Sequence, residues 1–151
     1  MLHSWLTCIL LTNNEKLCPG QVLCKRVVWN ESRHVDLVRA CETYEGVDFF
    51  RPQILNGNVL LYEVLIDEKL LGVFLVAVDT LMNGKRELVV LNGKSFNNEF
   101  GFIALGTHFV KVIAKSAGIP SIRHHSSSPG AGRIFQKTGW DKLETVWRIR
   151  V

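Results

Sequence analysis

Two adjacent β-rich runs constrain the fold of this chain more than any other feature of its sequence. Residues 59–80 read VLLYEVLIDEKLLGVFLVAVDT, in which branched and aromatic side chains lie on both sides of a short polar turn at Asp67–Lys69. Runs of this composition joined by a few polar residues are typical of an antiparallel hairpin. The sequence therefore predicts a strand pair over residues 59–80.

Strand and helix signals also precede this hairpin. Residues 6–12 and 21–29 are β-rich and are separated by the turn-rich segment NNEKLCPG, so they can form an N-terminal hairpin. Either Asn30 or Ser32 can cap a helix that runs to about Tyr44. Helical spacing places on one face of this helix Val35, Val38 and Cys41.

Less regular structure is expected immediately before the hairpin, and another strand after it. Residues 45–58 are predicted to be irregular or briefly helical, because Pro52 interrupts them. The segment MNGK, residues 82–85, has turn composition and leads into a predicted strand over 85–95.

A long helix is predicted over residues 101–117. Gly118 follows it in the position where a left-handed residue commonly ends a helix. Helical spacing places on one expected apolar face Ile103, Gly106, Val110, Ile113 and Ala117.

The C-terminal segment adds a strand, a second helix and a final strand. Residues 121–127 have the composition of a short strand. Ser128 can cap the following helix, with Pro129 at its first position, and Gly139 is placed to end it near Thr138. Alternation in LETVWRIRV then predicts a last strand over 143–151.

The order of these elements predicts a mixed sheet. A strand, a helix and a second strand after the hairpin imply a parallel pair, and the final strand would add an antiparallel partner. The length of 151 residues suits one α/β domain. We expect an extension over 1–22 and a core over 23–151.

Charge and hydropathy argue against several classes of protein. The net charge is +4, from 18 basic and 14 acidic residues, and it either serves solubility or attracts an anionic ligand such as a nucleotide phosphate. Since no arginine-rich run occurs, we do not expect a dedicated nucleic-acid binder. The apolar run at residues 5–11 is too short to span a membrane and lacks the features of a signal peptide, so a cytoplasmic location is expected.

The four cysteines lie in the first third of the chain, at Cys8, Cys18, Cys24 and Cys41. No two of them form a C-x-x-C pair, and their spacing does not match a paired zinc site. We expect buried free thiols, with two disulfides as the alternative, and no metal site.

Several segments together resemble the GCN5-related N-acetyltransferase (GNAT) superfamily. Residues 131–140, AGRIFQKTGW, are similar to the signature of its fourth helix, and LETVWRIRV is similar to its usual last strand. The hairpin with DEKLLGVFLV resembles its second and third strands. The resemblance covers residues 23–151 and implies a GNAT-like α/β fold, in which a mixed central sheet flanked by helices splays between the fourth and fifth strands and holds acetyl-CoA there.

The resemblance also implies cofactor-binding residues. Val89, Val90 and Leu91 would provide the backbone contact to the thioester carbonyl. The phosphate loop would correspond to Asn98, Gly101 and Ile103, with the amides of Gly101, Phe102 and Ile103 at the pyrophosphate. Two positions depart from the family pattern, because Ile103 replaces a small residue and Glu99 adds a negative charge beside the expected anion.

The residue expected to act as a general acid is also altered. Phe135 stands where many members of the superfamily carry a tyrosine, and phenylalanine has no proton to donate. For the base, the candidates are His124, His125 and Glu87. Because neighbours on a strand face opposite ways, at most one of the two histidines faces the cleft, and the pair can also be merely structural.

Two functions remain open from the sequence. The first is acetyl transfer from acetyl-CoA to an amine, on a small molecule or on a protein. The second is a non-catalytic GNAT-fold protein that binds partners in a larger assembly, such as a component of a bacteriophage virion. The altered positions Ile103 and Phe135 favour the second function, but the missing tyrosine does not exclude the first, since solvent can reprotonate a thiolate.

Overall fold

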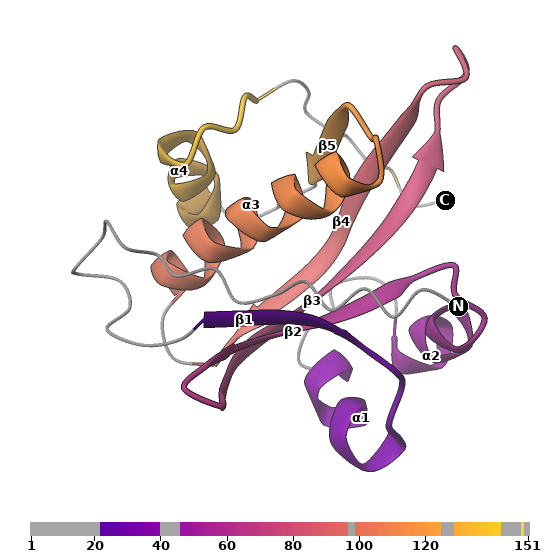
Figure 1. The fold of residues 1–151 in the computed structure, drawn as a ribbon, viewed down its shortest axis with the longest axis vertical. Coiled ribbons are helices and arrows are strands. Elements are labelled where there is room, and N and C mark those ends of the chain that lie inside the picture. Colours follow the sequence, from indigo (N-terminus) through magenta and orange to yellow (C-terminus); the bar gives the residue numbers. More distant parts are fainter. Residues whose placement is uncertain (1–21, 40–45, 97–98, 125–128, 143–148, 150–151) are drawn as a thin grey trace.

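The computed structural model describes residues 22–39, 46–96, 99–124, 129–142 and 149 (Figure 1). The predicted strands over 6–12 and 143–151, apart from Ile149, therefore lie outside the described residues, as do residues 125–127 of the strand predicted over 121–127. The observed elements are β1 (Val22–Val27), α1 (Glu31–Arg39), α2 (Val47–Leu55), β2 (Leu60–Ile66), β3 (Lys69–Thr80), β4 (Arg86–Ser95), α3 (Glu99–Ser116), β5 (Ser121–His124) and α4 (Pro129–Lys137).

The described strands form one mixed sheet in the order β1-β2-β3-β4-β5. Strands β1 to β4 pair in an antiparallel manner, and β5 pairs parallel to β4 through the α3 crossover. Both the predicted hairpin and the predicted parallel pair are confirmed. The hairpin turn is tighter than expected, because only Asp67 and Glu68 lie in it, with φ of 48° and 66°, and Lys69 already belongs to β3.

Helices cover the sheet on both faces (Figure 1). On one face, α1 and α2 place Val38, Phe50 and Ile54 against β2 and β3. On the other face, the side chains of α3 form the larger core with β1 to β4, and Trp140, just after α4, packs against this core. The structure therefore has three layers, and the sheet is the middle one.

Local signals at three helix ends are confirmed, whereas the predicted cap Ser128 lies outside the described residues. Asn30, rather than Ser32, caps α1, because its Oδ1 accepts a hydrogen bond from the amide of Arg33 at 3.2 Å. Gly118 and Gly139 have φ of 67° and 92° and follow α3 and α4. At both ends the next amide reaches back five residues, as in a Schellman motif: the amide of Trp140 donates to the carbonyl of Phe135 at 3.0 Å.

Of the two alternatives for residues 45–58, the brief helix is observed, as the nine-residue α2, but the expected interruption at Pro52 was wrong, because Pro52 lies inside this helix. A proline in a helix interior removes one hydrogen bond. Burial of Val47, Phe50 and Ile54 against the sheet offsets this loss, so packing outweighs the local preference.

Helix α3 begins at Glu99, two residues earlier than predicted, and its buried face also differs. Val110 and Ile113 are buried as expected, whereas Ile103 and Gly106 are only half-buried and Ala117 is exposed. The buried stripe is completed instead by Phe102, Leu105, Phe109 and Ala114. The helix is thus rotated about its axis relative to the predicted face.

A buried carboxylate joins α1 to the sheet. Glu63 on β2 is 1% exposed, and its carboxylate accepts hydrogen bonds from Arg33 Nε at 2.5 Å and from His34 Nε2 at 3.0 Å. Burial by itself would raise the pKa of Glu63, but the hydrogen bonds from Arg33 and His34 outweigh burial and hold that pKa below its ordinary value. His34 Nδ1 accepts the amide of Asn30 at 2.8 Å, so Nε2 is the nitrogen that donates to Glu63.

Cys24 on β1 is a buried free thiol, as predicted, and burial raises its pKa to about 12. The other three cysteines lie outside the described residues. None of the described helices is both long enough and apolar enough to cross a membrane.

Candidate functional site

The candidate site lies around His124, the last residue of β5 that the structure describes. The parallel ladder joins Glu87–Val90 of β4 to Ser121–His124 of β5, and β4 then continues to Ser95. On its other side, β4 pairs Val90 with Val76 and Asn92 with Leu75, so Leu91 is an additional residue in a β-bulge. A bulge bends its strand and leaves the extra residue outside the regular ladder. The bend therefore lies directly after Val90, which pairs with the last described residue of β5.

His124 lies at this point, in register with Val90. Its Nδ1 is 2.9 Å from the carbonyl oxygen of Val90. Because a carbonyl can only accept, Nδ1 must be the donor, and in the neutral ring Nε2 then carries the basic lone pair. The hydrogen bond thus selects the tautomer in which Nε2 can take up a proton.

Two aromatic rings from the α4 segment pack against this imidazole. The ring of Phe135 lies 4.8 Å from that of His124, and the ring of Trp140 lies 6.4 Å from it and 5.5 Å from Phe135. We call His124, Phe135 and Trp140 the aromatic cluster. Trp140 Nε1 donates to Thr107 Oγ1 on α3 at 2.8 Å, which ties the cluster to α3.

The N-terminal end of α3 follows β4 after only three residues, Phe96 to Asn98. The first N–H groups of a helix have no partner inside it, and the helix dipole favours an anion there. With α3 beginning at Glu99, the amide of Gly101 belongs to this set, whereas Ile103 lies beyond it. Asn98 is outside the described residues.

Phe102 is placed in the core and anchors the same end of α3. Its side chain is 8% exposed and packs over two glycines of the sheet, Gly72 on β3 and Gly93 on β4. The predicted cofactor contact of this residue could therefore come only from its backbone. The two glycines let the first turn of α3 approach the end of β4 closely.

The structure separates Glu87 from His124. Since side chains alternate along a strand, Glu87 and Val89 face the α1 and α2 side, whereas Leu88 and Val90 pack on the α3 side. Glu87 lies three residues before Val90, about 10 Å along the strand. Its carboxylate accepts a hydrogen bond from Ser121 Oγ at 3.3 Å and forms an ion pair with Arg123 Nε at 3.5 Å.

Of the predicted site residues, the structure brings together Val90, Leu91, His124 and Phe135. His125 lies outside the described residues. The sequence analysis did not identify Thr107 and Trp140 as site residues. Only the position of Trp140 directly after Gly139 could have indicated that its ring turns back toward α4.

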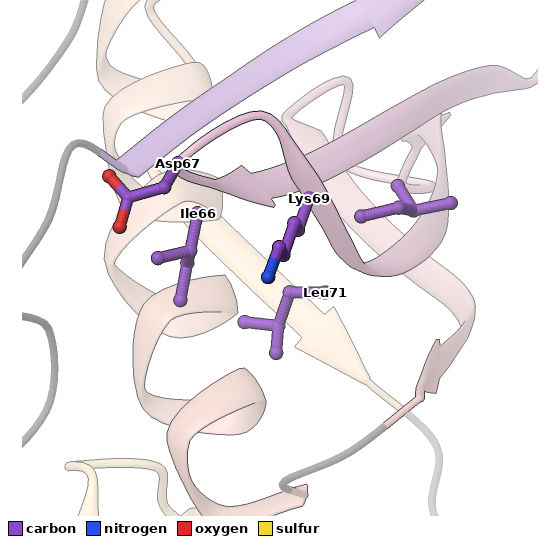
Figure 2. A pocket seen from close by; sticks show the side chains of 5 residues that line it. Ile66, Asp67, Lys69 and Leu71 are labelled. Carbon is purple, nitrogen blue, oxygen red and sulfur yellow. The ribbon is translucent and has the colours of Figure 1, made fainter.

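A separate hollow lies at the β2–β3 turn, with a volume of about 270 Å³. It is lined by Ile66, Asp67, Lys69, Leu70 and Leu71. Ile66 and Leu71 pack against the core that α3 forms with the sheet, and Figure 2 shows their side chains beside that of Lys69. None of the residues that define the bulge or the aromatic cluster lines this hollow, so we do not assign the chemistry to it.

Comparison with known proteins finds a similarity of fold and no significant similarity of sequence. No protein-family model matches the sequence, and no curated protein matches it significantly. Among solved structures, similar folds occur in an aminoglycoside acetyltransferase, meta-AAC0020, from an uncultured soil metagenomic sample. It is 11% identical, with a TM-score of 0.67 and coverage of 86% of this chain and 95% of that chain.

Two other similar structures are also acetyltransferases. The ribosomal-protein-alanine N-acetyltransferase of Brucella melitensis biovar Abortus 2308 is 12% identical, with a TM-score of 0.67 and coverage of 86% and 99% of the two chains. The aminoglycoside N-acetyltransferase AAC(6')-Iy, solved in complex with CoA, is 13% identical, with a TM-score of 0.66 and coverage of 87% and 95%. The protein thus has a GNAT-like α/β fold, a mixed sheet with helices on both faces.

Proposed function

We propose that this protein is an N-acetyltransferase that transfers the acetyl group of acetyl-CoA to an amine. The observation that carries this proposal is the bulge at Leu91, which bends β4 directly after Val90, the residue in register with His124 of β5. The similar structures include acetyltransferases, one of them solved with CoA, which supports the choice of acyl donor.

Two features of the described backbone support acetyl-CoA as the substrate. The start of α3 offers N–H groups to the pyrophosphate, and Gly101 adds no side chain there. Because Ile103 lies past these N–H groups, its size does not by itself exclude a phosphate. The bent stretch of β4 at Leu91 is the place where a strand amide could polarise the thioester carbonyl.

In the proposed reaction, the nitrogen of the acceptor amine attacks the acetyl carbon, the carbon–sulfur bond breaks and the thiolate of CoA leaves. His124 Nε2 takes the proton released by the nitrogen, directly or through water. The hydrogen bond from Nδ1 to Val90 supports this role, because it keeps Nε2 basic. Since Phe135 has no proton, the thiolate is protonated by solvent.

Binding and transfer should be measured separately. Calorimetric titration with acetyl-CoA measures binding, and mass spectrometry measures acetylation across a panel of amines. We expect binding in the micromolar range that is common for enzyme substrates. His124→Gln should lower kcat by roughly 10²-fold or more without weakening acetyl-CoA binding. His108→Gln, a histidine on α3 outside the site, is the matched control.

Two results would contradict the proposal in different ways. If the wild-type protein does not bind acetyl-CoA at millimolar concentration, the protein is not an acetyltransferase, and a non-catalytic binding role becomes the better explanation. If it binds acetyl-CoA and transfers acetyl groups equally well with and without His124, the assignment of the base is wrong.

A further inference from the structure

A polar contact attaches the aromatic cluster to α3. Thr107 is 6% exposed, and its hydroxyl oxygen accepts the indole N–H of Trp140 at 2.8 Å. An indole N–H has no other hydrogen-bonding capacity, so this contact determines how the ring is turned. The Gly139 turn, with φ of 92°, directs the chain so that Trp140 follows α4 and meets α3.

Trp140 in turn limits the positions that His124 can adopt. Its ring meets His124 at an interplanar angle of 65° and Phe135 at 72°, both edge-to-face arrangements. Phe135 packs on His124 from 4.8 Å. Rotation of the imidazole by half a turn would place carbon Cδ2 where Nδ1 lies and so break the hydrogen bond to Val90. The two neighbouring rings oppose that rotation.

We propose that Thr107 is a positioning residue for His124 and acts through Trp140. The contacts run from Thr107 Oγ1 to the indole, from the indole to the imidazole, and from imidazole Nδ1 to the carbonyl of Val90. The effect of Thr107 on the ring of His124 follows from these contacts alone. Its effect on catalysis rests on the proposed function.

The test compares Thr107→Val, which keeps the β-branched shape but removes the acceptor, with Thr107→Ser, which keeps the hydroxyl. The ring nitrogens of His124 are observed by ¹⁵N NMR in the protein without ligands and are assigned with His124→Gln. We expect one dominant tautomer, protonated at Nδ1, in the wild type and in Thr107→Ser. In Thr107→Val we expect a mixture of both tautomers.

Kinetics provide the second readout. Thr107→Val should lower kcat about threefold to tenfold, the size expected when one positioning hydrogen bond is lost, while KM for acetyl-CoA is unchanged. Thr107→Ser, which keeps the hydroxyl, should have the kcat of the wild type. Trp140→Phe should reproduce the effect of Thr107→Val, and the double variant should be no worse than either single one, because both remove the same contact.

Ile113→Val is the matched control for lost packing on α3. Ile113 is 6% exposed, like Thr107, but has no polar contact with the cluster. The Ile113→Val substitution should lower thermal stability but leave the tautomer of His124 and the kcat unchanged. If Thr107→Val leaves the ¹⁵N signals of His124 as they are in the wild type, the positioning role is wrong. If the signals change but no variant transfers acetyl groups, the positioning role holds and the proposed function fails.

Discussion

Gly72 offers a sharp test of how α3 is seated on the sheet. A methyl group at this position would lie 2.5 Å from Cε2 of Phe102 and closer still to the backbone carbonyl oxygen of Lys94. Carbon atoms in optimal contact are about 3.5–4.0 Å apart, so the added atom must displace its neighbours by about 1 Å. The carbonyl belongs to β4, which is paired with β3 at this point, and it cannot move without distorting the ladder.

The size of the effect follows from these contacts. Added atoms in a packed core cost about 1–3 kcal/mol, and we expect Gly72→Ala near 3 kcal/mol because both a ring and a backbone group must shift. For a chain of 151 residues this corresponds to a fall in Tm of about 6–12 °C. Since Phe102 anchors the first turn of α3, the proposed function predicts that the affinity for acetyl-CoA falls as well.

Gly93→Ala is the control, because Gly93 faces the same ring from the adjacent strand. A methyl group there would lie 3.4 Å from Phe102 Cε1 and 3.5 Å from Phe74 Cβ, both ordinary contacts. We expect its free energy of unfolding to stay within about 1 kcal/mol of the wild type. Urea unfolding followed by fluorescence measures both variants. Equal stability of the two variants would refute the seating of Phe102 described above.

Three further predictions address other parts of the structure. Gly139→Ala should destabilise the protein by about 1–2 kcal/mol, because φ is 92° at this position. Gly132→Ala lies inside α4, where a methyl group would meet nothing within 4 Å, and should stabilise the protein by about 0.5–1 kcal/mol. Thermal unfolding of the two variants checks both signs. The lowered pKa of Glu63 means that the folded protein favours the charged carboxylate. The stability that this carboxylate contributes is therefore present above the ordinary pKa of 4.5 and is lost as the pH falls through the lowered pKa. Glu63→Gln should flatten the dependence of the unfolding free energy on pH over this acidic range, and an unchanged dependence would contradict the assignment. Because burial raises the pKa of Cys24 to about 12, the thiol should resist iodoacetamide at pH 8 in the folded protein and react in urea, as peptide mass spectrometry can show.

The sequence predicted those parts of the fold that depend on local patterns. The hairpin over 59–80, the glycines that end α3 and α4, and the parallel pair could be predicted because turn residues and strand composition act over a few neighbours. The continuous α2 could not, since the burial of Val47, Phe50 and Ile54 against distant strands overrides Pro52.

The buried face of α3 and the bulge were not accessible to pattern reasoning. Apolar residues occur on several sides of α3, so periodicity does not identify the buried face. Gly72 and Gly93 make room for the ring of Phe102 only after the sheet has formed. Likewise, LVVL in β4 is uniformly apolar and shows no break at Leu91. The sequence could name His124 as a candidate, but its contact with Val90 depends on the register of two strands 34 residues apart.

The strand order has a consequence for how this protein folds. Strands β1 to β4 follow one another in space as they do along the chain, so all strands of the antiparallel ladders that the structure describes have been synthesised once the ribosome has passed Ser95. Pairings between neighbouring segments form quickly, because they close short loops. His124, Phe135 and Trp140 are all synthesised later, so the described antiparallel ladders can pair before any residue of the aromatic cluster is available.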